Sequence, residues 1–258
     1  MVIIAAMSSA LHVVRAGVGP RVLMIHGSAA DRTTWSIQLA SLRDRFAMIA
    51  YDRRSGELTV EDHAADAAGL LAQDPQPTLV IGSSFGAVVA LELIRTDPRS
   101  CAGAVLIEPP MGATDELPAA PAAFLAEFDR RVDEQGGPAA AEFFLRLVLG
   151  DDAFDRIPEA FQERSKSKFA EIRSDSAALI AYRPRYAELA TVAVPVLLLG
   201  GERSNAYFRP TLEALRSSLP NARLEQVPAG GHMLHAEAHR RFAELVTNMH
   251  AADCRVFL

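Results

Sequence analysis

The sequence of 258 residues has little cysteine and no long apolar run. Its two cysteines, Cys101 and Cys254, form no cluster with metal-ligand spacing, so they predict free thiols in a reducing compartment rather than a disulfide framework. No stretch approaches about 18 consecutive apolar residues, which excludes a predicted membrane-spanning helix. Residues Met1–Ala10 are only briefly apolar and lack a basic segment, so no signal peptide is expected. These absences together predict a cytoplasmic protein.

Lysine is almost absent, since Lys166 and Lys168 are the only two in the chain, and no run of lysine or arginine occurs. The formal net charge is −6. The sequence therefore excludes a partner whose phosphates would be bound by lysine and arginine side chains. We expect neither a nucleic acid nor a membrane partner. Half of the residues are hydrophobic and 22% are charged, which is enough apolar material for one large α/β core with an insertion.

Short apolar runs rich in valine, isoleucine and leucine recur along the chain between turn residues. Their hydrophobicity is continuous rather than alternating, which is typical of strands buried on both faces of a parallel sheet. Segments of helical length lie between them, and this alternation predicts a doubly wound α/β domain. The expected strands are Leu11–Val14, Val22–Ile25, Ala47–Ala50, Leu79–Ile81, Ala104–Ile107, Val196–Leu199 and Arg223–Val227. The expected helices between them are Trp35–Arg45, Val60–Leu71, Ala87–Arg95, Pro210–Leu219 and Ala238–Asn248.

The alternation stops after Glu108. From Met111 to about Leu189 the sequence predicts no strand, and a helical insertion that leaves and re-enters a sheet favours a lid over a separate domain. We therefore expect residues 1–110 and 190–258 to form the α/β core and residues 111–189 to form a helical lid, entered through the Ala/Pro-rich stretch Leu117–Ala123. The four expected lid helices are Ala122–Glu134, Ala139–Leu149, Phe154–Phe169 and Ser176–Leu189.

The strand Leu79–Ile81 runs directly into Gly82-Ser83-Ser84-Phe85-Gly86, which is followed by a helical pattern. Gly-x-Ser-x-Gly at a strand-to-helix junction places its serine on a sharp turn, with the hydroxyl above the strand ends. The two glycines remove Cβ atoms that would collide with the adjacent strand and helix, and the helix N-terminus supplies free N–H groups where an oxyanion forms. Ser84 is therefore the predicted nucleophile, and Ser83 is the competing hydroxyl.

With this motif the chain resembles the α/β-hydrolase superfamily over nearly its whole length except the helical insertion. His26-Gly27 after an expected strand is similar to the family's His-Gly motif, with Trp35 at a familiar spacing. The resemblance implies an α/β-hydrolase fold and an oxyanion hole made by the backbone N–H of Ser28, or of Ala29, together with that of Phe85.

A serine nucleophile needs a general base, and histidine is the usual one because its pKa lies near the working pH. In this fold the chain order is Ser, acid, His, so the base lies late in the sequence. Gly230-Gly231-His232 resembles the family's Gly-x-Gly-His loop, so His232 is the predicted base. His235 and His239 follow it at helical spacing, but no matching acidic or cysteine ligands accompany them, so we expect no metal site.

The acid is where the sequence departs from the family pattern. The usual position follows the strand Val196–Leu199, and there the chain has Ser204, which cannot stabilise an imidazolium as a carboxylate does. Two carboxylates keep the required chain order. Glu108, at the end of the strand after the nucleophile, is favoured, and Glu202 is the alternative.

Aromatic residues in the expected lid predict a pocket that is largely apolar. We expect a serine hydrolase of the carboxylic-ester type, without a cofactor, that cleaves a small to medium, largely apolar ester, thioester or lactone through an acyl-enzyme at Ser84. The alternative is a non-hydrolytic lyase or cyclase, or a ligand-binding protein, on the same scaffold, because Ser204 leaves the usual acid position without a carboxylate. The expected pocket residues are Trp35, Phe124, Phe128, Phe143 and Phe144.

Overall fold

The computed structural model describes residues 11–116 and 122–252. The segment Met1–Ala10, residues 117–121 of the expected lid entrance and Cys254 lie outside the described residues. Cys101 is buried and free. In the two described ranges, no helix has both the length and the apolar character needed to cross a membrane.

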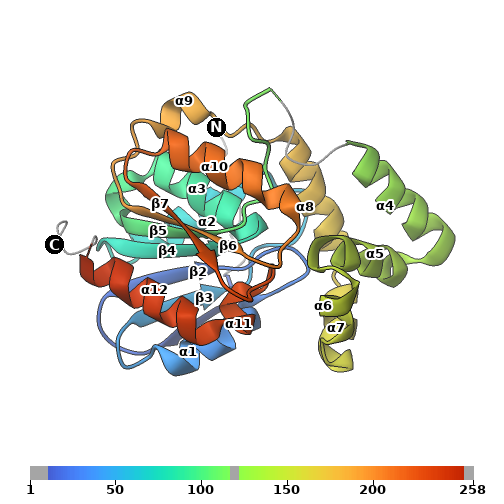
Figure 1. The fold of residues 1–258 in the computed structure, drawn as a ribbon, viewed down its shortest axis with the longest axis horizontal. Coiled ribbons are helices and arrows are strands. Elements are labelled where there is room, and N and C mark those ends of the chain that lie inside the picture. The colour runs from blue at the N-terminus through green and yellow to red at the C-terminus, as the bar shows by residue number, and fades with distance from the viewer. Residues whose placement is uncertain (1–10, 117–121, 253–258) are drawn as a thin grey trace, which may run out of the picture.

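A seven-stranded sheet with the order β1-β3-β2-β4-β5-β6-β7 forms the centre of the molecule (Figure 1). Only the edge strand β1 is antiparallel to its neighbour, β3, and all other pairs are parallel. The predicted α/β class with a mostly parallel sheet is therefore confirmed, and all seven expected strands are present. Their bounds are β1 (Val13–Ala16), β2 (Arg21–Ile25), β3 (Ala47–Tyr51), β4 (Thr78–Ser83), β5 (Cys101–Ile107), β6 (Val196–Gly201) and β7 (Ala222–Val227).

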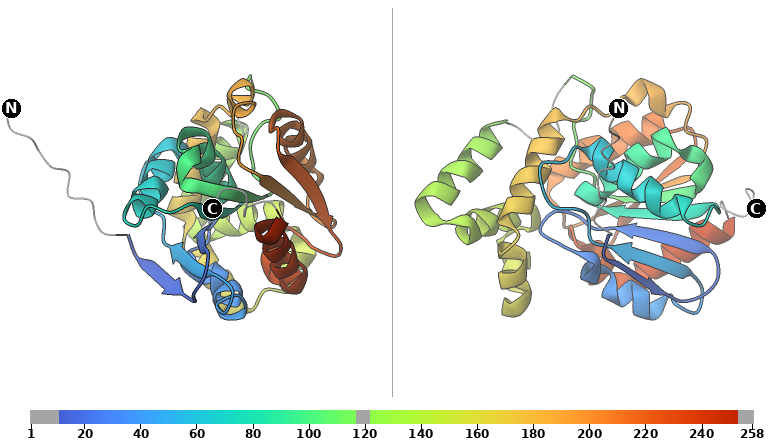
Figure 2. Two further views of the ribbon diagram at one scale, coloured as in Figure 1. Left: turned by 90° about the vertical axis from the view of Figure 1, so that its left-hand side faces the viewer. Right: turned by 180° about the vertical axis from the view of Figure 1, so that it is seen from behind.

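Helices cover both faces of the sheet, which is why its central strands read as unbroken apolar runs. One face packs against α2 (Val60–Ala72), α3 (Phe85–Thr96) and α10 (Arg209–Ser218). The other packs against α1 (Ser36–Ser41) and α12 (His239–Ala252), as Figures 1 and 2 show. Short helical turns complete the connections: η1 (Arg32–Trp35), η2 (Pro98–Ser100), η3 (Ala206–Phe208), α9 (Tyr186–Leu189) and α11 (Leu234–Glu237).

Between β5 and β6 the described residues contain helices and no strand, as the sequence predicts. The first five of these helices are α4 (Ala122–Gln135), α5 (Gly137–Leu149), α6 (Asp151–Asp155), α7 (Glu159–Lys166) and α8 (Phe169–Ala181). We call them the helical segment. It has an apolar core of its own, which includes Phe128, Phe154 and Ile172, and it projects beyond one end of the sheet (Figure 1).

Two of the four helices expected here are wrong in extent, and proline accounts for part of each error. The expected helix Phe154–Phe169 is split, because Pro158 lies at the start of α7 and cannot continue α6. The expected helix Ser176–Leu189 begins earlier, at Phe169. It also ends earlier, at Ala181, because Pro184 restricts the residue before it and removes a backbone donor. The chain then turns through Arg185, whose φ is +54°, before α9 begins.

Candidate active site

Ser84 lies on a strained turn between β4 and α3. Its φ of +55° falls in the left-handed region that residues other than glycine rarely adopt. It is the residue that precedes the first turn of α3, and its own N–H donates to the Ile107 carbonyl of the neighbouring strand at 2.8 Å. Ser84 is partly exposed, whereas Ser83 and Phe85 on either side of it are buried. The turn thus lifts one side chain out of the core.

The predicted reason for the two glycines of the motif is confirmed by the geometry. A Cβ at Gly82 would lie 2.2 Å from the Gly86 carbonyl oxygen. A Cβ at Gly86 would lie 2.3 Å from the Ile25 carbonyl oxygen. Both distances are far inside van der Waals contact, so only glycine allows β2, β4 and α3 to approach this closely.

The loop after β2 passes directly beside Ser84. A Cβ on Gly27 would lie 2.9 Å from the Ser84 Cβ, so the absence of a side chain at Gly27 brings the backbone of Ser28 to the nucleophile. Ala29 follows with a φ of +57°. On the other side Phe85 is the first residue of α3, where N–H groups have no partner within the helix. The two predicted amide donors, Ser28 and Phe85, thus directly follow in the chain the two residues that approach each other here, Gly27 and Ser84.

His232 and Glu108 form a buried pair. His232 lies in the loop between β7 and α11, and its Nδ1 is 2.6 Å from the Glu108 Oε2. The other carboxylate oxygen of Glu108 accepts from the Gly201 N–H at 2.7 Å, and Glu108 is 1% exposed. Its backbone turns into the left-handed region, with a φ of +44°, directly after β5. On its other side the His232 ring stacks on Phe208, with centroids 4.5 Å apart.

The alternative acid lies elsewhere. Glu202 is exposed, and its Oε2 accepts from the Ala229 N–H at 2.9 Å, so it stabilises the loop after β7. Ser204, at the family's usual acid position, has a buried hydroxyl for which the described residues provide no hydrogen-bond partner. Of the two carboxylates that the sequence offers, the structure brings only Glu108 to His232.

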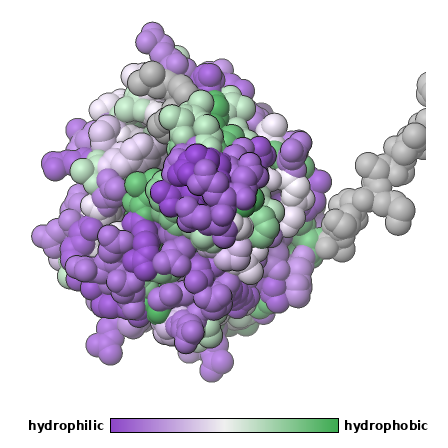
Figure 3. Space-filling model, turned by 90° about the vertical axis from the view of Figure 1, so that its right-hand side faces the viewer, coloured by the Kyte–Doolittle hydropathy of each residue, from purple (hydrophilic) through white to green (hydrophobic). Residues whose placement is uncertain are grey.

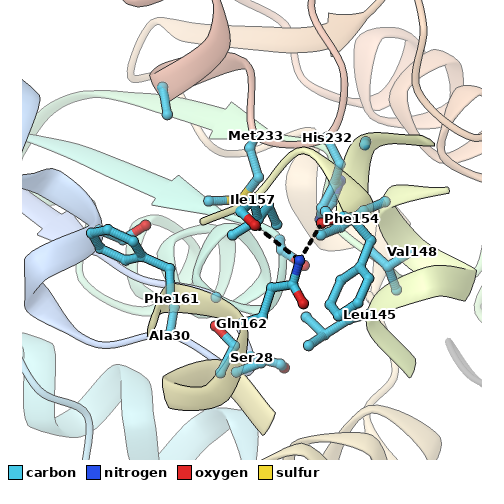
Figure 4. A pocket seen from close by; sticks show the side chains of 18 of the residues that line it. Ser28, Ala30, Leu145, Val148, Phe154, Ile157, Phe161, Gln162, His232 and Met233 are labelled. Atoms are coloured by element: carbon cyan, nitrogen blue, oxygen red, sulfur yellow. Dashed lines mark hydrogen bonds between the residues drawn. The ribbon is translucent and has the colours of Figure 1, made fainter. Parts of the chain in front are cut away.

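A cavity of about 580 Å³ opens in front of Ser84 and His232. One part of its wall is apolar and comes mainly from α5, α6 and the turn before α7 (Figure 4). The Gln162 amide of α7 donates to the carbonyls of Phe154 and Ile157 and so ties α6 and α7 together along this wall. The apolar wall residues include Phe144, Leu145, Val148, Leu149, Phe154, Ile157, Phe161 and Met233.

Four of the five expected pocket residues need correction, because only Phe144 lines the cavity. Trp35 is fully buried in the core, where its ring packs against His235 at 4.7 Å and against Phe242. Phe124, Phe128 and Phe143 pack among themselves where α4 meets α5. These three phenylalanines hold α4 and α5 together. Short helices must bury their apolar faces against one another to be stable, so these side chains are not available to a ligand.

Sequence reasoning missed a buried ion pair beneath the loop of Ser28. Asp175 of α8 accepts from both terminal nitrogens of Arg53, at 2.9 and 2.7 Å, and both side chains are 5% exposed. Asp175 also accepts from the Ser28 hydroxyl at 2.7 Å. Arg53 donates onward to the His26 carbonyl and stacks over the Phe85 ring. The pair therefore links the helical segment to both predicted oxyanion donors, and no local motif marks it.

Three buried histidines predict a loss of stability in mild acid. Burial lowers the pKa of His235 from 6.5 to about 3 and that of His63 to about 4, and burial together with Arg53 lowers the pKa of His26 well below 6.5. These rings are neutral in the folded state at a pH where the unfolded chain protonates them. Their contribution to stability is therefore complete above pH 6.5 and is lost as the pH falls towards 4, by up to about 1.4 kcal/mol per pH unit for each ring.

Urea unfolding at pH 7.5, 6.0 and 5.0 measures this loss, and the His63→Gln variant should show a shallower dependence on pH. Asp31, with its pKa lowered to about 2, loses its contribution only below about pH 4 and so does not interfere. A free energy of unfolding that stays constant from pH 7.5 to 5.0 would contradict the expectation.

Known proteins resemble this chain along most of its length. The alpha/beta hydrolase family matches residues 22–245. The pimeloyl-[acyl-carrier protein] methyl ester esterase of Yersinia enterocolitica is 21% identical over 235 residues, which are 88% of this chain and 91% of that protein. The uncharacterised hydrolase YraK of Bacillus subtilis is 33% identical over 94 residues, and the match covers 32% of this chain and only 35% of that relative's length.

Among solved structures, an esterase from Thermogutta terrifontis superposes with a TM-score of 0.77 at 26% sequence identity, covering 92% of each chain.

Proposed function

Because the chain belongs to the alpha/beta hydrolase family, we propose that it is a serine hydrolase that forms an acyl-enzyme at Ser84. Its substrates are small to medium, largely apolar esters, thioesters or lactones. The observation that carries the proposal is the buried contact of 2.6 Å between Glu108 and the Nδ1 of His232, on a ring that lines the same cavity as Ser84. An esterase relative that matches 88% of this chain supports the same reaction class.

The reaction begins with proton transfer. With Nδ1 held by Glu108, the Nε2 of His232 takes the proton of the Ser84 hydroxyl as its oxygen attacks the carbonyl carbon of the substrate. The negative charge moves to the carbonyl oxygen, which accepts hydrogen bonds from the N–H groups of Ser28 and Phe85. When the carbonyl re-forms, the bond to the leaving alcohol or thiol breaks, and that group takes the proton from His232.

Water completes the cycle by the same route. His232 takes a proton from water, the hydroxide attacks the acyl carbon, and the second tetrahedral oxyanion is held by the same two amides. Its collapse releases the carboxylic acid, and the proton on His232 returns to the Ser84 oxygen. Glu108 stays ionised throughout and stabilises the imidazolium in both halves of the reaction.

Glu108 suits this role because the fold fixes both of its oxygens. Oε1 accepts from the Gly201 N–H and Oε2 faces His232, so the carboxylate cannot rotate away. Stacking on Phe208 fixes the ring from a second direction. A base held in one orientation and one tautomer loses little entropy when it enters the transition state.

The helices between β5 and β6 would then serve as a lid over the cavity, with residues 111–189 as the lid and residues 1–110 and 190–258 as the core. Residues of α5 and α6 supply most of the apolar wall, and residues of α7 face the loop after β2. An apolar acyl chain gains binding free energy on this wall, while the reacting carbonyl stays at Ser84.

A fluorophosphonate probe tests the proposal. We expect the intact wild-type protein to gain the mass of one phosphonyl group, because an activated serine attacks phosphorus as it attacks a carbonyl. The Ser84→Ala variant should gain none, and the matched variant Ser83→Ala should still be labelled. A folded wild-type protein that gains no mass would overturn the hydrolase proposal in favour of a binding protein on the same scaffold.

A further inference from the structure

The cavity in front of Ser84 is positively charged, although the whole chain has a formal charge of −6. Four cationic side chains line it, and only two carboxylates do. The cations are Arg156, Arg164, Lys168 and Arg203, and the carboxylates are Asp31 and Glu237. Figure 3 shows that hydrophilic residues predominate on the side of the molecule where the helical segment projects, with smaller apolar areas between them.

Lys168 is the most enclosed of these four cations, and its ammonium group lacks hydrogen-bond partners among the described residues. It lies between α7 and α8, and its side chain is 22% exposed. Its only ionic contact among the described residues is with the Asp31 Oδ2, at 3.7 Å, which is longer than a hydrogen bond. The ammonium group has three donors, and none of them donates to a described residue.

Asp31 cannot neutralise both of its cationic neighbours. It already accepts from the Thr33 N–H at 2.9 Å, from the Thr33 hydroxyl at 2.6 Å and from Arg164 at 2.5 Å. These bonds hold the pKa of Asp31 at about 2, so it carries a single negative charge at neutral pH. One carboxylate thus stands between two cations, and one positive charge is left uncompensated in the cavity wall.

The uncompensated charge lies on the side of the cavity nearest the predicted oxyanion loop. Asp31 follows Ser28 and Ala29 in the chain, and all three residues line the cavity with Lys168. The positive charge of Lys168 is also close enough to His26 to lower the pKa of that ring further. A ligand whose reacting carbonyl sits at Ser84 can therefore reach Lys168 without leaving the cavity.

We propose that the substrate of this hydrolase carries a carboxylate as well as the bond that is cleaved, and that Lys168, together with Arg164, binds that carboxylate. The inference rests on the proposed function and narrows its substrate class to compounds with an apolar body and one anionic end, on either the acyl or the leaving-group side of the cleaved bond. The apolar wall from α5 and α6 holds the body. An enclosed cation favours such an anion more than an exposed one, because water screens the pair less.

The only other lysine provides a matched control. Lys166 lies two residues away at the end of α7, and it pairs with Glu163 at 2.6 Å and with Glu142 at 3.4 Å. It does not line the cavity. Lys166→Gln and Lys168→Gln therefore remove the same group from the same short stretch, but only the second removes a charge from the cavity.

The test compares esters that differ only in charge. Mono-p-nitrophenyl adipate and p-nitrophenyl hexanoate share a six-carbon acyl chain and a leaving group, and only the first has an anionic acyl end. 4-Acetoxybenzoate and its methyl ester place the charge on the leaving group instead. We expect the wild-type protein to prefer one of the charged esters in kcat/KM over its neutral partner, and the pair that shows the preference identifies which side of the substrate faces Lys168.

In the Lys168→Gln variant this preference should fall about tenfold, mainly through KM, whereas Lys168→Arg and Lys166→Gln should keep it. The preference of the wild type should also weaken as salt is raised. No preference in the wild type, or an equal effect of Lys168→Gln on charged and neutral esters, would overturn the inference while leaving the hydrolase proposal intact. Failure of the wild-type protein to hydrolyse any of the four esters or to react with a fluorophosphonate would instead overturn the proposed function.

Discussion

Replacing Glu108 with glutamine is expected to lower kcat about 10³- to 10⁴-fold for a neutral p-nitrophenyl ester, with little change in KM. Glutamine keeps the size of the side chain, and its amide can still meet the Gly201 N–H or the His232 ring. It cannot carry the negative charge that stabilises the imidazolium, and an amide that turns its NH₂ towards His232 selects the wrong tautomer of the ring. Steady-state kinetics at pH 7.5 measure the effect.

The matched control is Glu202→Gln. Glu202 is the other late carboxylate, but it is exposed and bonded to the Ala229 N–H, so its charge is not in contact with His232. We expect its kcat to stay within about threefold of the wild type, since surface substitutions have small effects. The reverse pattern, with a large effect at Glu202 and none at Glu108, would identify Glu202, in the loop after β6, as the catalytic acid.

The second large effect concerns stability. Replacing Asp175 with asparagine is expected to lower the free energy of unfolding by about 3–5 kcal/mol, because it leaves the Arg53 guanidinium buried without a counter-charge. It should also lower kcat, since Ser28 loses the charged acceptor that fixes its loop. Urea unfolding and kinetics on the same samples separate the two effects. We expect KM for a neutral ester to change less than kcat.

The same helix provides the control. Arg173 of α8 forms a two-bond pair with Asp129 of α4, at 2.7 and 3.0 Å, but this pair is exposed. Asp129→Asn should therefore cost at most about 1 kcal/mol. A double variant, Arg53→Met with Asp175→Leu, should be more stable than Asp175→Asn, because it removes both buried charges together. Equal losses for Asp175→Asn and Asp129→Asn would contradict this account.

The strands and the nucleophile turn could be predicted because their signals are local. A central parallel strand must be apolar on both faces, so the strands inside the sheet show in the sequence to within a few residues. The edge strands β1 and β7 are only partly buried, and the expected strand Leu11–Val14 overlaps β1 by only two residues. Gly82 and Gly86 are required by contacts with β2 and α3 that any chain with this turn must make. Glu108 could be predicted as the acid because a carboxylate directly after so apolar a strand is unusual and lies at the edge of the sheet where the nucleophile is expected.

The contacts of the helical segment could not be predicted in the same way. Asp175 meets Arg53 across 122 residues and Ser28 across 147, so no spacing rule relates them. Phenylalanines on the α4 and α5 helices have the same periodicity whether they face one another or the cavity. Only the packing of α4 on α5 decides that Phe143 stacks on Phe124 and that Phe144 lines the cavity.

The position of Glu108 has a consequence for how the protein is made. Strands β4 and β5 are adjacent, with Ser83 paired to Ile107, so one strand–helix–strand unit of residues 78–108 carries both the proposed nucleophile and the proposed acid. Both residues leave the ribosome before β6 and β7 have been made, because synthesis proceeds from the N-terminus. His232 is synthesised more than 120 residues after Glu108 and joins them only when β7 has been added beside β6. The proposed site can therefore be completed only after the last strand of the sheet has been synthesised.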